Sequence, residues 1–272
     1  MIPVNPGNIL PFYTDKDMQR HRQHGSDQQP FGLLASRTQL IPWQLRGQSG
    51  FVSSITVSLV NALDESMVTV ITPDLEYIYQ LGGGWWITYK GATISDTVDD
   101  CGYYYLKVEA GFFGTFYSDV MQVINLQSKG EEGKLEWWSE TDKAEVLYQT
   151  GYKQHVWFQP NPVWGIPEIK DSPEELRNGF GKLVDTFAIT EERLQFDVAS
   201  IPDYALHTLT GVGYNDNVKV SASMNGILKY ELTIEEVRFQ HRKEGIALNT
   251  GTFSCIGRRE IFTACQPNFQ QD

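Results

Sequence analysis

Short apolar stretches alternate with polar turns along most of the chain from residue 40 onward. Residues 51–60 and 67–72 are rich in β-branched residues, and the polar stretch 61–66 lies between them. Strands separated by turn residues at intervals of about 8–12 residues are typical of a β-sandwich. About seven such strands fall between residues 40 and 125, so the pattern predicts an all-β fold.

Two hairpins are predicted in this first part. Residues 76–80 and 85–89 flank the run Gly82-Gly83-Gly84, and glycine is a turn residue between strands. Residues 102–109 and 116–123 form the second predicted hairpin, which turns at Ala110-Gly111.

The second part begins after a small, charged and glycine-bearing stretch at 128–133, which predicts a linker. The strands predicted after it span 135–138, 145–148, 155–158, 182–190, 194–200, 218–222, 228–234, 236–240 and 247–256. Residues 171–175 are expected to form a single helical turn, and Glu191-Glu192 to separate two strands. Residues 202–209 are the most helical segment.

Residues 1–40 have little regular periodicity, because prolines and a polar run interrupt it. A short helix at 15–24 is the one regular element that this segment could form. Ordering so long an arm alone is entropically unfavourable, so we expect it to pack on a neighbouring copy. The predicted organisation is an N-terminal arm (1–40), an immunoglobulin- or fibronectin-like β-sandwich (41–127), a linker (128–133) and a second β-rich domain with one short helix (134–272).

Two tryptophan doublets, Trp85-Trp86 and Trp137-Trp138, are prominent among the aromatic residues. Adjacent residues of a strand point to opposite faces, so each doublet places one indole in a core and one on the other face. Outward aromatics favour a protein interface, and stacking on sugar rings or packing beneath the arm are the alternatives. The candidate interface or binding residues are Trp85, Trp86, Tyr103, Tyr105, Phe112, Phe113, Trp137 and Trp138.

Charge and composition exclude several classes of protein. The 272-residue chain has a formal net charge of -12, which argues against binding to a nucleic-acid backbone. No apolar run approaches the roughly 20 residues of a membrane span, and no secretory signal is recognisable at the N-terminus. The three cysteines, Cys101, Cys255 and Cys265, are expected to be reduced thiols of a chain made in a cytoplasm.

Candidate chemistry is sparse. His21 and His24 with Asp27 have metal-ligand residue types, but a solvated polar arm accounts for them, so no metal and no other cofactor is expected. Neighbouring acids such as Glu174-Glu175 point apart on a strand and cannot form the carboxylate pair of a glycosidase. No nucleophile motif is present. The sequence therefore predicts a protein that is not an enzyme.

Several stretches resemble virion proteins of tailed phages that infect Bacteroidetes, including the crAss-like group. The opening is similar in Ile9-Leu-Pro-Phe-Tyr13 and Leu40-Ile-Pro-Trp-Gln-Leu45. The recurring aromatic hairpin is similar in Cys101-Gly-Tyr-Tyr-Tyr-Leu-Lys107 and Phe116-Tyr-Ser-Asp-Val-Met-Gln-Val123. In the second half, Pro202-Asp-Tyr-Ala-Leu-His-Thr-Leu209 before Asn215-Asp216-Asn217-Val218 also fits.

This resemblance implies a non-enzymatic structural component of a phage particle, in the tail, at the baseplate or at a fibre attachment. Such a protein would be made in the host cytoplasm, reside in the virion, and bind copies of itself and other virion proteins. The alternative is a glycan-binding β-sandwich module for attachment to the host surface.

Overall fold

Most of the residues that the structure describes are in β-strands. The computed structural model describes residues 7–19, 33–36, 40–48, 55–71, 75–81, 84–89, 98, 101–111, 114–124, 131–143, 146–148, 151–158, 168–177, 183–224, 227–233, 236–241 and 248–260. Within them, the helices are α3 (Asp203–Thr210) and the short 3-10 helices η1 (Lys16–Met18) and η3 (Val212–Tyr214). The predicted all-β class with one short helix near residues 202–209 is confirmed.

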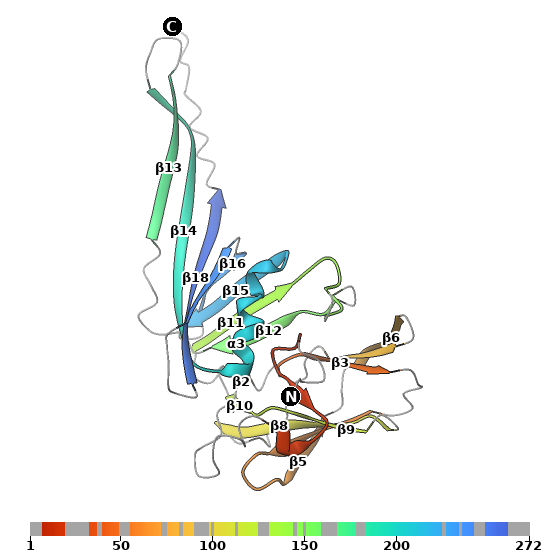
Figure 1. Ribbon diagram of the computed structural model, residues 1–272. Coiled ribbons are helices and arrows are strands. Elements are labelled where there is room, and N and C mark those ends of the chain that lie inside the picture. The colour runs from red at the N-terminus through yellow and green to blue at the C-terminus, as the bar shows by residue number, and fades with distance from the viewer. Residues whose placement is uncertain are drawn as a thin grey trace.

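An 11-stranded sheet forms the body of the molecule (Figure 1). Its strands from the first half are β1 (Phe12–Tyr13), β2 (Leu33–Ser36), β4 (Thr56–Asn61), β5 (Met67–Ile71), β8 (Gly102–Glu109), β9 (Thr115–Ser118) and β10 (Met121–Ile124). Those from the second half are β11 (Glu131–Trp138), β12 (Gln154–Phe158), β15 (Asn217–Met224) and β16 (Ile227–Thr233). The path runs β1-β9-β8-β10-β2-β12-β11-β15-β16, while β4 pairs with β8 and β5 with β4.

Strand β2 joins the two halves of the chain. It pairs in parallel with β10 and antiparallel with β12, so the described strands on both sides of residues 128–133 belong to one sheet. Residues 131–133, which the sequence assigns to a linker, are instead the start of β11 and pair with β15. Gly133 is a strand residue, and a Cβ there would collide with the ring of Phe158.

A second, three-stranded sheet contains β3 (Trp43–Gln48), β7 (Gly84–Tyr89) and β6 (Leu75–Leu81), in that order. The antiparallel pairing of β6 with β7 confirms the first predicted hairpin. In the second hairpin, the single strand predicted at 116–123 is two strands, β9 and β10, which both pair with β8. The strand is interrupted at Asp119. The buried carboxylate of this residue accepts hydrogen bonds from Val120 N at 2.8 Å and from the Tyr13 hydroxyl at 3.4 Å.

The third sheet projects from the body (Figure 1). Its order is β13 (Glu168–Arg177), β14 (Leu183–Pro202), β18 (Leu248–Glu260) and β17 (Glu236–His241). The helical turn predicted at 171–175 is wrong, because these residues pair with β14 as part of an edge strand, where a proline such as Pro173 is tolerated. The two strands predicted on either side of Glu191-Glu192 are one continuous strand, because both glutamates pair with β13 and β18.

Helix α3 connects the projecting sheet to the body. It lies close to β14, β17 and β18, while its Ala205 and Leu209 are buried in the main core. The same core contains residues from Ile9 to Val220. The described residues before and after 128–133 therefore share one hydrophobic core.

The described part of the N-terminal arm packs within its own chain. Ile9, Leu10 and Phe12 are fully buried, and the rings of Phe12 and Trp43 lie 5.1 Å apart. The expectation that the arm packs on a neighbouring copy is therefore wrong for residues 7–13, because the main core covers their apolar side chains. Of the helix considered at 15–24, the described residues form only η1.

A buried polar network fixes the arm to distant segments. Gln44 Nε2 donates to Leu147 O at 2.8 Å and to Thr88 Oγ1 at 3.1 Å, while Gln44 Oε1 accepts from Leu147 N at 2.9 Å. The side chain of Asn8 bonds both backbone groups of Gln44. Asn8 O in turn accepts from Thr208 Oγ1 of α3 at 3.3 Å. Buried polar groups require such partners, and here the partners come from both halves of the chain.

Candidate protein interface

The outer face of the body sheet carries a set of apolar and aromatic side chains. Strand alternation puts Tyr104, Leu106 and Val108 of β8 into the main core, and this directs Tyr103 and Tyr105 to the opposite face. Register places neighbouring outward residues of β4, β5 and β9 beside them. We call this surface the tyrosine face and define it as Val60, Met67, Val70, Tyr103, Tyr105 and Tyr117.

Exposure varies across the tyrosine face. Tyr105 is buried with Val60 and Val120, and its ring lies 6.4 Å from that of the half-buried Tyr117. Met67 and Val70 are 65% and 53% exposed, which is high for apolar strand residues. The face thus changes from packed at β8 to open at β5. Among the candidates from sequence, Tyr103 is half-buried here, whereas Tyr105 is an internal packing residue.

Residues 13–19 bind at one side of the tyrosine face. Gln19 Nε2 donates to Ser118 O at 2.6 Å, and Lys16 forms an ion pair with Glu65 in the β4–β5 turn. Asp15 caps η1 by accepting from Asp17 N at 3.0 Å. These contacts hold residues 16–19 against β9 and the β4–β5 turn.

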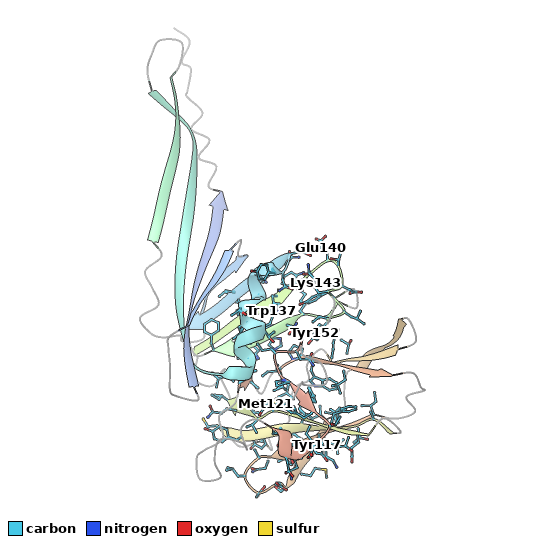
Figure 2. The ribbon with its side chains drawn as sticks, in the orientation of Figure 1. Tyr117, Met121, Trp137, Glu140, Lys143 and Tyr152 are labelled. Atoms are coloured by element: carbon cyan, nitrogen blue, oxygen red, sulfur yellow. The ribbon has the colours of Figure 1, made fainter. Side chains whose placement is uncertain are left out.

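The second tryptophan doublet occupies both faces of β11. Trp137 is 1% exposed in the main core, and Figure 2 labels it together with Tyr152 in the body. Trp138 points the other way and packs on Val146, Tyr148 and Tyr152. The predicted two-sided arrangement is confirmed for this doublet. Trp137 is a core residue, and only Trp138 retains an accessible ring.

Lysine side chains cover the indoles on the outer face of β11 and β12. Lys153 Nζ lies 4.1 Å from the ring centroid of Trp138, and Lys134 Nζ lies 5.6 Å from that of Trp157. Glu136 bridges the two lysines, at 2.7 Å from Lys134 and 3.7 Å from Lys153. A ring face that an ammonium group covers is not free to stack on a sugar ring. The two lysine–tryptophan pairs are therefore best explained as cation–π contacts that stabilise the fold.

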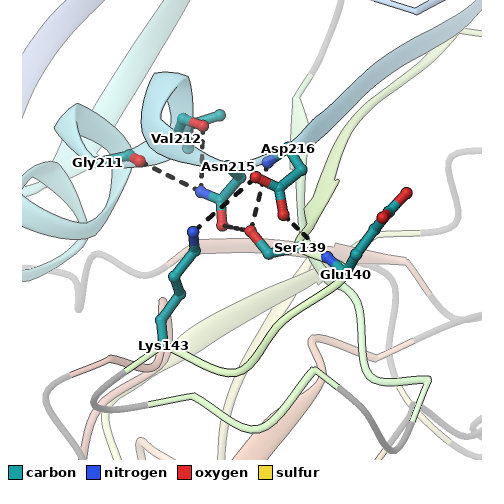
Figure 3. Close-up of polar contacts among 7 residues, drawn as sticks. All are labelled: Ser139, Glu140, Lys143, Gly211, Val212, Asn215 and Asp216. Carbon is teal, nitrogen blue, oxygen red and sulfur yellow. Dashed lines mark hydrogen bonds and ion pairs between the residues drawn. The ribbon is translucent and has the colours of Figure 1, made fainter.

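A group of hydrogen bonds connects the residues that follow β11 with η3 and the residues after it (Figure 3). Ser139 Oγ lies 3.2 Å from Asn215 Oδ1, and Glu140 N donates to Asp216 Oδ2 at 2.9 Å. Asn215 Nδ2 donates to Gly211 O and Val212 O, the carbonyls of the residue before η3 and of its first residue. Lys143 Nζ is 3.9 Å from Asp216 Oδ1. The arrangement is a structural cap, and its carboxylate is already engaged by a backbone amide and a lysine.

His155 is a buried histidine on β12. It is 1% exposed, and its Nε2 has no hydrogen-bond partner among the described residues. Burial lowers the pKa of His155 well below its ordinary value, the charge of Lys134 lowers it further, and a hydrogen bond with the Leu40 backbone acts in the opposite direction. His155 therefore stays neutral at pH 7, and the uncharged ring packs against Trp157 at 5.5 Å.

Acid is expected to destabilise the protein through His155. The unfolded histidine binds its proton near pH 6.5 and the folded one only at lower pH, so stability falls as pH drops below about 6.5, by up to about 1.4 kcal/mol per pH unit. Urea unfolding of the wild type and His155→Gln at pH 7.5, 6.5 and 5.5 measures this. The midpoint should fall more steeply with acid in the wild type than in the variant. Equal slopes would show that His155 is not the acid-sensitive group.

For the remaining interface candidates that the sequence suggested, the structure does not describe the side chains. Trp85 and Trp86 lie in the middle strand of the three-stranded sheet, where β7 pairs with β3 and β6. Phe112, Phe113 and the group His21, His24 and Asp27 lie outside the described residues. Among the described residues, no three His, Cys, Asp or Glu residues are grouped as metal ligands.

Sequence reasoning missed the open end of the tyrosine face. Val60, Met67 and Val70 were assigned to strands but not to a site. Alternation within 67–71 indicates outward apolar residues, but only the topology shows that β5 is an edge strand among the described strands.

No family model matches this chain, and no curated protein matches it. Among solved structures, it is similar to a chain from the crystal structure of the ZIG-8 IG1 homodimer, at 14% sequence identity. That alignment covers 38% of this chain and 90% of the other, with a TM-score of 0.16, which is too low to inform fold or function. None of the described helices is long and apolar enough to cross a membrane.

Proposed function

We propose that this protein is a non-enzymatic structural component of a phage virion, in the tail, at the baseplate or at a fibre attachment, and that it acts through protein–protein interfaces. The observation that carries the assembly role is the projecting sheet. Strand β14 contains 20 residues, and at about 3.3 Å per residue such a strand extends about 65 Å. Figure 1 shows β13 and β14 running away from the body.

A projection of this form is suited to contact with another protein. In Figure 1, β13 and β14 are the strands that reach furthest from the body. A two-stranded hairpin on its own is at best marginally stable in water. Packing against a partner would add stabilising contacts to such a sheet. The resemblance of the arm and hairpin motifs to virion proteins of tailed phages supports placing that partner in a phage particle.

The gene neighbourhood and a shortened projection test this role. Neighbouring genes should encode portal, capsid and tail proteins, and a metabolic gene cluster would contradict the virion assignment. For the assembly role, a variant can join Lys170 to Glu191 through Asn-Gly, because these two residues are opposite each other in the β13–β14 register. The shortened variant should keep the thermal transition of the body but lose the rings or fibres expected of the intact protein in electron microscopy. Identical assemblies from both would contradict the proposal.

Charged residues at matching register positions are expected to stabilise the projection. Glu191 lies opposite Lys170 of β13 and Arg258 of β18. Glu191→Lys would put three basic residues in one row, and we expect a local loss of about 0.5–2 kcal/mol. Hydrogen exchange of the amides of β13 and β14 measures it. Adding Arg258→Glu should restore part of the protection of these amides against exchange. No recovery would show that the stability at Lys170, Glu191 and Arg258 does not depend on charge.

A glycan-binding module for attachment to the host surface is the second candidate, and the half-buried rings of Tyr103 and Tyr117 favour it. Flat aromatic faces suit sugar stacking as well as protein contact. A glycan array compares the wild type with Tyr103→Ala, Tyr117→Ala and the pair Trp85→Ala and Trp86→Ala. Sugar retention that disappears in these variants would favour this candidate over the assembly role.

A further inference from the structure

Strand β5 forms one edge of the body sheet as far as its strands are described. It pairs with β4 on one side, and no described strand pairs with its other side. Alternate residues of an edge strand direct N–H and C=O groups away from the sheet, where a further strand can bind them. The stretch Met67–Ile71 contains three β-branched residues in Val68, Thr69 and Val70, ends in a fourth, and has neither a charge nor a proline.

Natural edge strands are commonly protected by charged side chains, and β5 has none. Its exposed residues are instead Met67 and Val70, which lie on the open end of the tyrosine face. One irregularity is present: the register with β4 shifts between Leu59 and Val60. Residues 69–71 lie on the regular side of that shift.

The turn before β5 fixes the position of the strand. Asn61 N donates to Ser66 O at 2.9 Å, and Asp64 Oδ1 accepts from Ser66 N at 2.9 Å. Asn61 Oδ1 accepts from Leu63 N at 2.8 Å. Within this turn, Leu63 is 69% exposed, even more than Val70, but it lies off the strand. Leu63 is therefore a matched control for an exposed apolar residue on the same hairpin.

We propose that β5 pairs antiparallel with β5 of a second copy of this chain, about a two-fold axis at Val70. This inference rests on the proposed function, since it names one interface through which the protein would assemble. The axis puts Val70 opposite Val70 of the copy and Thr69 opposite Ile71. Opposite residues of an antiparallel pair point to the same face. Here Thr69 and Ile71 share the inner face through their register with Leu59 and Val57, while both Val70 side chains are outward.

The distribution of charge favours a second copy of the chain as the partner of β5, and antiparallel over parallel pairing. A two-fold contact requires a surface that matches itself, and an uncharged strand does so without placing like charges opposite each other. The acidic residues Asp64 and Glu65 precede β5. Antiparallel pairing holds these turns at opposite ends of the contact, whereas parallel pairing would bring them to the same end.

Sedimentation velocity over a concentration series tests the dimer. The wild type should dimerise. Val70→Lys puts two ammonium groups opposite each other at the axis, and the dissociation constant should rise at least about tenfold. Leu63→Lys adds the same charge to the same hairpin and should leave the constant unchanged. Thermal unfolding should show that both variants fold, since both sites are exposed in the single chain.

Cysteine cross-linking locates the contact independently. Opposite residues of an antiparallel pair have Cα atoms about 4.5–5.5 Å apart, a separation that a disulfide can span. In a Cys101→Ser background, which removes an exposed thiol, mild oxidation should trap Val70→Cys as a disulfide-linked dimer but not Leu63→Cys. A wild type that is monomeric throughout, or a Val70→Lys dimer as tight as the wild type, overturns the β5 pairing. The gene neighbourhood and the shortened projection would still decide the proposed virion role.

Discussion

Trp137→Ala should reduce the free energy of unfolding by about 3–5 kcal/mol, because the substitution leaves a cavity where a fully packed indole was. Trp137 is 1% exposed and lies in the core that holds residues from both halves of the chain. The loss should therefore shift the whole unfolding transition and not one part of it. Urea unfolding followed by far-ultraviolet circular dichroism measures the change without depending on tryptophan fluorescence.

Trp138→Ala is the matched control for this prediction. Its ring is half-buried and contacts Lys153 at 4.1 Å, so removing it should cost about 1–2 kcal/mol through lost packing and a lost cation–π contact. A loss at Trp138 equal to or larger than that at Trp137 would contradict the assignment of the two faces of β11.

Gln44→Leu should reduce the free energy of unfolding by about 2–4 kcal/mol. The side chain makes three buried hydrogen bonds, two to the backbone of Leu147 and one to Thr88. Each such bond contributes about 1 kcal/mol net, and its loss also leaves buried groups with fewer partners. The larger apolar content of leucine does not offset this, because the site is polar on several sides.

Gln122→Leu provides the comparison, because Gln122 is a half-buried strand glutamine with no side-chain hydrogen bond recorded within the described part of the chain. We expect its effect to remain within about 0.5 kcal/mol. Hydrogen exchange should show that Gln44→Leu weakens both β3 and β12, since Gln154 of β12 bonds Ile9 N beside the same network at 3.2 Å. Weakening confined to β3 would show that the network does not couple the two halves.

Local patterns predicted the elements whose partners are close in sequence. The β6–β7 hairpin and α3 depend on nearby turn and helix residues, and both appear where the sequence places them. The uninterrupted course of β14 could not be predicted, because Thr-Glu-Glu-Arg at 190–193 has the polarity of a turn. The residues opposite Glu191 in the register, Lys170 and Arg258, are about 20 and 70 residues away in the sequence.

The candidate surface could also be predicted only where it depends on residues that are close in sequence. Alternation predicted one inward and one outward indole in each tryptophan doublet, and Trp137 and Trp138 have that arrangement. Whether an outward residue is covered depends on neighbours that are remote in sequence. Tyr105 is buried with Val60 and Val120. Val70 is 53% exposed, and among the described strands β5 pairs with β4 alone.

The pairing of β2 with both β10 and β12 has a consequence for how the chain reaches its native state. Contacts between segments so distant in sequence form slowly, because the loop between them must first be closed. During synthesis, a nascent chain of 127 residues would have β2 and β10 but not β12, and would present an unpaired edge beside an incomplete core. We therefore expect nascent chains of this length to remain aggregation-prone and sensitive to protease, and to become resistant only after the strand at 217–224 has left the ribosome.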